Sequence, residues 1–165
     1  MGLETKVDHL KVIVFDLDYT LWPFWVDTHV DPPFQKKGDK VYDRNNQHVT
    51  YYKEVPAVLE KLISLGYELG IASRTGAIEE AEDLLRLFNW NQYFSYKQIY
   101  PGTKTTHIKR ISKDSGVKLS EILFFDDESR NIRDLTAINV CSILVHSGVT
   151  MEVVRKGIQT FVNSS

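Results

Sequence analysis

Short runs of apolar residues alternate along the chain with segments in which apolar residues recur at helical spacing. The short runs are rich in branched or aromatic residues and end at polar or turn-forming residues, which is typical of buried strands. The predicted strands are residues 11–15, 67–72, 122–125 and 141–145, with one more short strand between Ser73 and Lys104.

The segments between these runs are predicted to be amphipathic helices. The first begins with Pro56 in its first turn and ends before Gly66, as helices commonly do. The predicted helices are residues 56–65, 77–88, 105–115, 129–138 and 151–162.

Nearly continuous apolar strands alternating with helices predict a doubly wound α/β fold, in which helices cover both faces of a parallel sheet. We expect a single domain over residues 1–165. The alternation breaks only at about residues 22–53, where residues 40–42 and 48–52 flank an Asn-rich turn and predict a β-hairpin insertion.

The composition is that of an ordinary globular protein, with 165 residues, 42% of them hydrophobic, and a formal net charge of -2. This charge produces no field that would attract nucleic acid or an acidic membrane, so neither is expected as a partner. The single cysteine, Cys141, forms no internal disulfide, and the apolar run at 12–15 is too short for a membrane span or a signal sequence. A cytoplasmic or nuclear location is expected.

Polar residues follow the predicted strands at the edge of the sheet where doubly wound folds bind ligands. Asp16 and Asp18 come directly after the first strand, followed by Thr20. Two buried carboxylates that lie close together repel each other unless one is protonated or a cation offsets their charge. The alternative is that both are turn or helix-capping residues, as single aspartates after strands often are.

The second strand ends in Ser73 and Arg74, a hydroxyl and a guanidinium that can hold an oxyanion. Thr75 is expected to cap the helix that follows. Lys104, expected in the loop before the next helix, is the candidate for a cation from the protein.

A second carboxylate pair, Asp126 and Asp127, follows the strand at 122–125. Oxygen-rich sites of this kind suit Mg²⁺. At an effective dielectric constant near 20, each like-charge pair ~4 Å apart costs ~4 kcal/mol, so acids gathered around a phosphate require a metal.

The motif D-L-D-Y-T, the serine, the lysine and the D-D pair occur in the order, and at the strand ends, of phosphatases of the haloacid dehalogenase superfamily. The longer stretch D-L-D-Y-T-L-W-P-F-W-V-D-T-H-V-D-P-P-F resembles the eukaryotic magnesium-dependent phosphatase family more specifically.

This resemblance implies that Asp16 is the nucleophile, which forms an aspartyl-phosphate, and that Asp18 is the acid and base. It implies that the phosphate is held by Asp16, Leu17, Ser73, Arg74 and Lys104. It also implies that Mg²⁺ is bound by Asp16, the backbone carbonyl of Asp18 and Asp127, with Asp126 as a supporting or alternative ligand.

The short insertion implies a protein without the cap domain of many superfamily members, and hence an open site. The expected function is a Mg²⁺-dependent phosphomonoesterase acting on phosphotyrosine in peptides or proteins. Sugar phosphates, including fructosamine phosphates, are the alternative substrates. A receiver-like phosphoacceptor domain is an alternative of a different class. Receivers place their lysine after the acidic residues, whereas in this chain Lys104 precedes the second acid pair. An inactive binding module is a third alternative.

Several residues near these motifs have simpler interpretations. Trp22, Phe24 and Trp25 are expected to pack the insertion onto the domain, the alternative being that they line the mouth of the pocket. Tyr51, Tyr52 and Cys141 are expected to be packing residues, and His107 and His146 surface or loop histidines. Arg130 and Asn131 are interpreted either as supporting groups of the site or as a solvated helix start.

Overall fold

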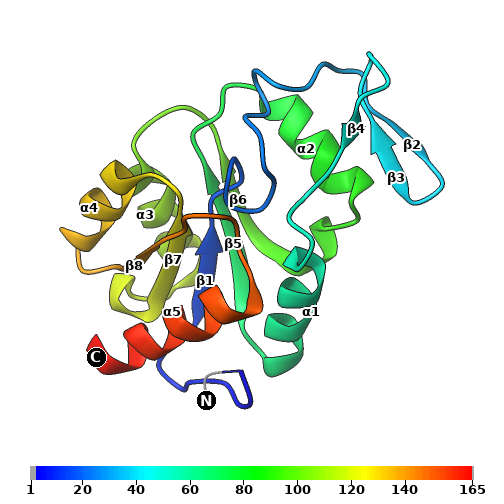
Figure 1. Ribbon diagram of the computed structural model, residues 1–165. Coiled ribbons are helices and arrows are strands. Elements are labelled where there is room, and N and C mark those ends of the chain that lie inside the picture. The colour runs from blue at the N-terminus through cyan, green and yellow to red at the C-terminus, as the bar shows by residue number, and fades with distance from the viewer. Residues whose placement is uncertain (1–2, 165) are drawn as a thin grey trace.

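A five-stranded parallel sheet forms the centre of the computed structural model, which describes residues 3–164 (Figure 1). The strand order is β6-β5-β1-β7-β8. The strands are β1 Val12–Phe15, β5 Glu68–Ser73, β6 Phe94–Ile99, β7 Ile122–Asp126 and β8 Cys141–Leu144. The predicted α/β fold with a parallel sheet is confirmed. The four sheet strands that were predicted with bounds match β1, β5, β7 and β8 to within two residues, and β6 lies between Ser73 and Lys104 as expected.

All five predicted helices are present, and a short 3-10 turn precedes each of β6 and β7. The helices are α1 Val55–Leu65, α2 Ile78–Leu87, α3 Lys104–Ser115, α4 Ser129–Thr136 and α5 Met151–Ser164, and the 3-10 turns are η1 Asn91–Tyr93 and η2 Leu119–Glu121. α1 ends as predicted at Gly66, whose φ of 101° is available to glycine at little cost.

Alternation of side chains along β1 divides the core into two clusters, one on each face of the sheet. Val12 and Val14 pack with residues of α3 and α4, whereas Ile13 and Phe15 pack with residues of α1, α2 and α5. Every residue of β1 is buried, which explains why the strand is continuously apolar in sequence.

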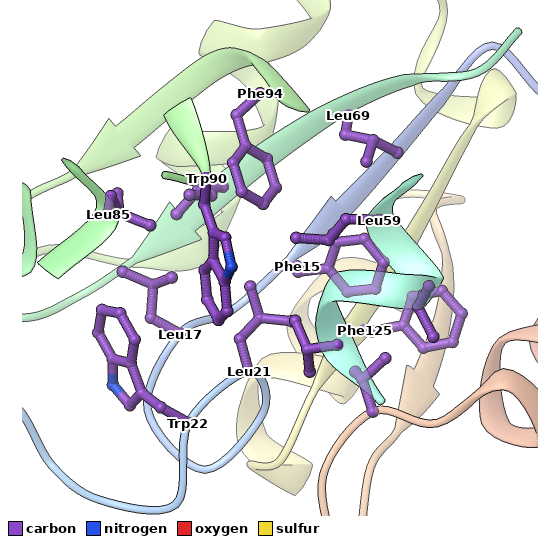
Figure 2. Packing of buried hydrophobic residues seen from close by; sticks show 14 of the residues in the cluster. Phe15, Leu17, Leu21, Trp22, Leu59, Leu69, Leu85, Trp90, Phe94 and Phe125 are labelled. Carbon is purple, nitrogen blue, oxygen red and sulfur yellow. The ribbon is translucent and has the colours of Figure 1, made fainter. Parts of the chain in front are cut away.

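The larger cluster is rich in aromatic side chains (Figure 2). Phe15 stacks on Phe125 from the neighbouring strand, with ring centroids 5.3 Å apart. Trp90, next to η1, packs near Trp22 from the loop after β1, with centroids 6.3 Å apart. Full burial of a side chain of this size stabilises the fold by roughly 1.5–3 kcal/mol, so this cluster anchors the loop that follows β1.

The order in which the strands are added to the sheet changes direction between β1 and β7, so this is the topological switch point of the fold. It passes from β1 to β5 and β6 on one side, then returns to β7 and β8 on the other. Ligands of open α/β sheets bind outside the carboxyl ends of the strands at such a switch point. The acidic residues after β1 and β7 therefore lie where a ligand is expected.

The insertion differs from the predicted hairpin, because it forms a three-stranded antiparallel sheet of β2 Gln35–Lys37, β3 Lys40–Tyr42 and β4 His48–Val49. β2 was not predicted because all three of its residues are exposed and show no alternation. β4 ends three residues earlier than predicted. The small sheet lies beside and beyond α2, away from the carboxyl end of β1 (Figure 1).

Within residues 3–164, no helix combines the length and the apolar character needed to cross a membrane.

Candidate active site

The turn after β1 places two carboxyl groups on one cleft. The carbonyl of Leu17 accepts hydrogen bonds from the N–H groups of Thr20 (3.0 Å) and Leu21 (2.9 Å), which folds the chain back immediately after the strand. Asp16 and Asp18 both line the resulting cleft. The Thr20 hydroxyl donates to Oδ2 of Asp16 at 3.3 Å, so the threonine of D-L-D-Y-T orients the first aspartate.

Lys104 is the buried cation of the site. Its side chain is 1% exposed, and its Nζ donates to Oδ1 of Asp16 at 3.1 Å and to Oδ2 of Asp126 at 2.5 Å. Burial alone lowers the pKa of Lys104, but the two carboxylates outweigh it and raise the pKa, so the ammonium form is favoured. Lys104 was predicted to lie in the loop before α3, but it is the first residue of that helix.

Three carboxyl groups meet beside Lys104. One oxygen of each of Asp16, Asp126 and Asp127 lies within 4.8 Å of the others. Burial raises the pKa of Asp127 to about 6, with Asp126 adding to the effect. Burial also raises the pKa of Asp16 well above its usual range, although Lys104 opposes the shift. The chain therefore concentrates more negative charge than its own cation balances.

This donor set fits Mg²⁺, which prefers carboxylate oxygens and leaves positions for water and phosphate. Asp126 is fully buried and both its oxygens are engaged: Oδ1 accepts from the N–H of Glu128, and Oδ2 accepts from Lys104 and Asn131. Asp127 is partly exposed and lines the cleft. Asp127 is thus the freer of the two to bind a metal, with Asp126 holding Lys104.

Asp18 is held by two donors on a single oxygen. Its Oδ1 accepts from Nε1 of Trp22 at 2.8 Å and from the N–H of Val26 at 3.1 Å. Burial raises the pKa of Asp18, and these two hydrogen bonds only partly oppose the shift. The two hydrogen bonds hold the carboxyl group in place, and the raised pKa makes its protonated form, which a general acid requires, easier to populate than in a free aspartate.

We expect Trp22→Phe to lower kcat roughly 2- to 10-fold, because a hydrogen bond to an uncharged group contributes about 0.5–1.5 kcal/mol and its loss frees Asp18 to rotate. Steady-state kinetics measure the effect. Trp90→Phe is the matched control: Trp90 is also buried, in the same aromatic cluster. Both variants should lose stability, but only Trp22→Phe should lose kcat. Equal kinetic losses would contradict the orienting role.

The end of β5 brings Ser73 and Arg74 to the same cleft. Ser73 is buried, and its hydroxyl accepts from the N–H of Thr75 at 3.3 Å. Arg74 donates to Oδ1 of Asn131 at 3.5 Å. The predicted capping by Thr75 is wrong: its hydroxyl accepts from the N–H of Ala77 at 3.1 Å, but Ala77 is the N-cap of α2 and no side chain caps the helix.

The three aromatic residues after D-L-D-Y-T divide into two roles. Trp22 and Phe24 are buried and stack with ring centroids 5.3 Å apart, as expected for packing residues. Trp25 is 49% exposed and lines the cleft, so the packing interpretation is wrong for it. Its ring stacks on His29 at 5.3 Å and meets Tyr19 edge-on at 5.7 Å.

The cleft has a volume of about 310 Å³, and Trp25 is its only aromatic lining residue within the described chain. Asp27, Thr28 and Glu128 also line it and were not predicted, because exposed polar residues beside a motif carry no distinctive pattern. Asn131, for which the sequence permits two roles, is buried and donates to Asp126 at 3.0 Å. The supporting interpretation of Asn131 is therefore correct.

His107 is not a surface histidine, contrary to expectation. It is fully buried on the same face of α3 as Lys104. The three-residue spacing from Lys104 on a helix is the signal that could have located it.

Comparison with solved structures agrees with the fold. A dehalogenase matches with a TM-score of 0.63 at 13% identity, covering 86% of this chain and 87% of that chain. The N-terminal part of a Bacteroides fragilis protein containing a phosphatase domain, complexed with Mg, matches with a TM-score of 0.58 at 14% identity, covering 92% of this chain and 39% of that chain.

Sequence comparison is more specific. Residues 8–164 match the family model described as Acid Phosphatase. Human magnesium-dependent phosphatase 1 is 50% identical over 155 residues, 93% of this chain and 88% of that protein. A HAD-like hydrolase superfamily protein of Schizosaccharomyces pombe is 38% identical over 138 residues, 76% of this chain and 80% of that protein. The chain therefore belongs to the acid phosphatase family and is a magnesium-dependent phosphatase of the haloacid dehalogenase superfamily.

Proposed function

We propose that this phosphatase hydrolyses aryl phosphomonoesters, with phosphotyrosine in peptides or proteins as the substrate class. The observation that carries the proposal is the half-exposed ring of Trp25 on the wall of the cleft that contains Asp16. Aromatic rings stack favourably at such a surface. The small sheet of the insertion lies beside and beyond α2 and not over the carboxyl end of β1, which supports a substrate that presents its phosphate on a large molecule (Figure 1).

In the proposed reaction, a carboxylate oxygen of Asp16 attacks phosphorus as the bond from phosphorus to the phenolic oxygen breaks. Asp18 donates its proton to the departing oxygen, and the product is an aspartyl-phosphate. Asp18 then takes a proton from a water molecule whose oxygen attacks phosphorus. The bond from Asp16 to phosphorus breaks, which releases inorganic phosphate and restores both side chains.

The remaining residues hold the phosphoryl group. The proposal assigns to Ser73 and Arg74, which line the cleft, and to the N–H of Leu17 the role of donating to its oxygens. Lys104 balances the charge on Asp16 and on the transferring group. Mg²⁺, when bound by Asp16, Asp127 and the carbonyl of Asp18, supplies positive charge that offsets the carboxylates and the phosphate.

Sugar phosphates are the second candidate substrates, and the polar lining of the cleft favours them. Apart from Trp25, the wall consists of charged or hydroxyl-bearing residues such as Asp27 and Thr28, together with Asn131. Such groups can bond to the hydroxyl groups of a sugar.

Trp25→Ala separates the two candidates. Loss of an aromatic stacking partner worth about 0.5–1.5 kcal/mol should lower kcat/KM for a phosphotyrosine peptide roughly 3- to 10-fold, with less than about a 2-fold change for a hexose 6-phosphate. Because the ring is half-exposed, the free energy of unfolding should change by less than about 1 kcal/mol. Kinetics on both substrates and a urea titration measure these effects.

Tyr51→Ala is the control, because Tyr51 is also partly exposed but packs on Phe88 and Trp90, outside the cleft. It should leave the ratio of the two kcat/KM values unchanged. If Trp25→Ala leaves kcat/KM for the peptide unchanged, or lowers kcat/KM equally for both substrates, the proposed aryl preference is wrong and the sugar-phosphate candidate is favoured.

A further inference from the structure

His107 contacts both ends of the loop that precedes Lys104. The loop consists of Tyr100, Pro101, Gly102 and Thr103 and joins β6 to α3; we call it the lysine loop. Nδ1 of His107 lies 2.9 Å from the carbonyl oxygen of Thr103, and Nε2 lies 2.7 Å from the carbonyl oxygen of Tyr100. The histidine ring therefore spans the lysine loop from its first residue to its last.

The ring is also fixed by packing. His107 is fully buried and stacks on Tyr100, with ring centroids 4.3 Å apart and planes inclined by 12°. Between these two carbonyls the loop passes through Gly102, whose φ of 136° is a conformation that side-chain-bearing residues rarely adopt. His107 is thus a single side chain that contacts the backbone on both sides of this glycine.

The same contacts connect Lys104 to the residue proposed to bind phosphate. The N–H of Tyr100 donates to the carbonyl of Ser73 at 3.0 Å, while the carbonyl of Tyr100 faces His107. Lys104 follows Thr103 directly and has its Nζ between Asp16 and Asp126. His107 thus touches the backbone beside Lys104 and, through Tyr100, the backbone of Ser73.

We infer that His107 is a positioning residue that sets the place of the Lys104 ammonium relative to Asp16 and Ser73. It contacts neither the substrate nor Asp16, and it acts through the two carbonyl groups of the lysine loop. A displacement of about 1 Å of a group that acts at the reacting centre can lower the rate by up to ~10²-fold. The inference rests on the role proposed for Lys104.

Three substitutions at His107 separate its contacts. His107→Phe keeps an aromatic ring on Tyr100 but donates no hydrogen bond. His107→Asn places an amide donor near the position of Nδ1, and His107→Gln places one near that of Nε2. We expect kcat to fall roughly 10- to 100-fold in His107→Phe, with KM changed less than about 3-fold, and His107→Asn or His107→Gln to recover part of the loss.

Ile111→Ala is the stability control, because Ile111 is fully buried on the same helix but lies beside Gly70, in the middle of β5, and not beside the lysine loop. It should lower the free energy of unfolding while leaving kcat within about 2-fold of the original. A purely structural role for His107 predicts instead that kcat follows stability, with no recovery in the Asn and Gln variants; that result would overturn the inference.

A double-mutant cycle with Lys104→Gln tests whether His107 acts through Lys104. Glutamine removes the charge but keeps donors for Asp126. Lys104→Gln alone should lower kcat strongly, and adding His107→Phe should lower it less than about 2-fold further. Unchanged activity in Lys104→Gln would refute the role of Lys104 itself. If instead the factors by which the two single substitutions lower kcat multiply in the double variant, the role of Lys104 stands and the inference about His107 is refuted.

Discussion

Replacement of Asp16 by Asn is expected to abolish turnover, lowering kcat by roughly 10⁴-fold or more, because an amide does not form the acyl phosphate on which the reaction depends. The fold should survive. Asn still accepts a hydrogen bond from Lys104, and the change removes one of three crowded carboxyl groups. Hydrolysis of an aryl phosphate measures the first effect, and urea denaturation measures the second.

Asp39→Asn is the matched control, since Asp39 is exposed in the turn between β2 and β3 and lies outside the cleft. Its activity should equal that of the unaltered protein. Trapping with hydroxylamine during turnover should detect an acyl phosphate in the control and none in Asp16→Asn. Activity of Asp16→Asn within about 10-fold of the control would refute the assignment of the nucleophile.

Removal of Mg²⁺ is expected to have the second largest effect. Chelation with EDTA should lower the hydrolysis rate at least roughly 10²-fold, and added Mg²⁺ should restore it. The reason is electrostatic: three carboxyl groups meet within 4.8 Å, and among the described residues only Lys104 forms ion pairs with them before a phosphate dianion enters. At an effective dielectric constant near 20, each like-charge pair ~4 Å apart costs about 4 kcal/mol.

The two acids after β7 should respond differently to substitution. Asp127→Asn should raise the Mg²⁺ concentration needed for half-maximal activity at least roughly 10-fold, because Asp127 faces the cleft. Asp126→Asn should mainly lower kcat at saturating Mg²⁺, because Asp126 is buried against Lys104. A Mg²⁺ titration of each variant measures both quantities. The opposite pattern would identify Asp126 as the metal ligand.

The repeating elements of the fold were predictable because the sheet is buried on both faces. All residues of β1 and β7 are buried, so these strands read as uninterrupted apolar runs that end abruptly at acids. The helices were predictable from their periodicity and from signals such as Gly66. The insertion was less predictable, because the exposed residues of β2 carry no alternation.

The site was predictable to the extent that its residues follow strands. Asp16, Ser73 and Asp126 are brought together because the carboxyl ends of parallel strands share one edge of the sheet. Trp25 and His107 were misjudged for the opposite reason. Trp25 lies in an irregular loop whose path depends on packing around Trp22, and His107 is buried by the loop before its own helix.

Residue type and spacing alone specify the parallel α/β sheet, the order of the motifs along it and the chemical groups available at its edge, because strand burial and strand connection follow from them. Which of these groups touch is set by the tertiary structure. It placed Lys104 between Asp16 and Asp126, turned Trp25 toward the cleft and enclosed His107 against the lysine loop. These relations join residues far apart in the chain or in irregular loops, where side-chain packing rather than local periodicity sets the geometry.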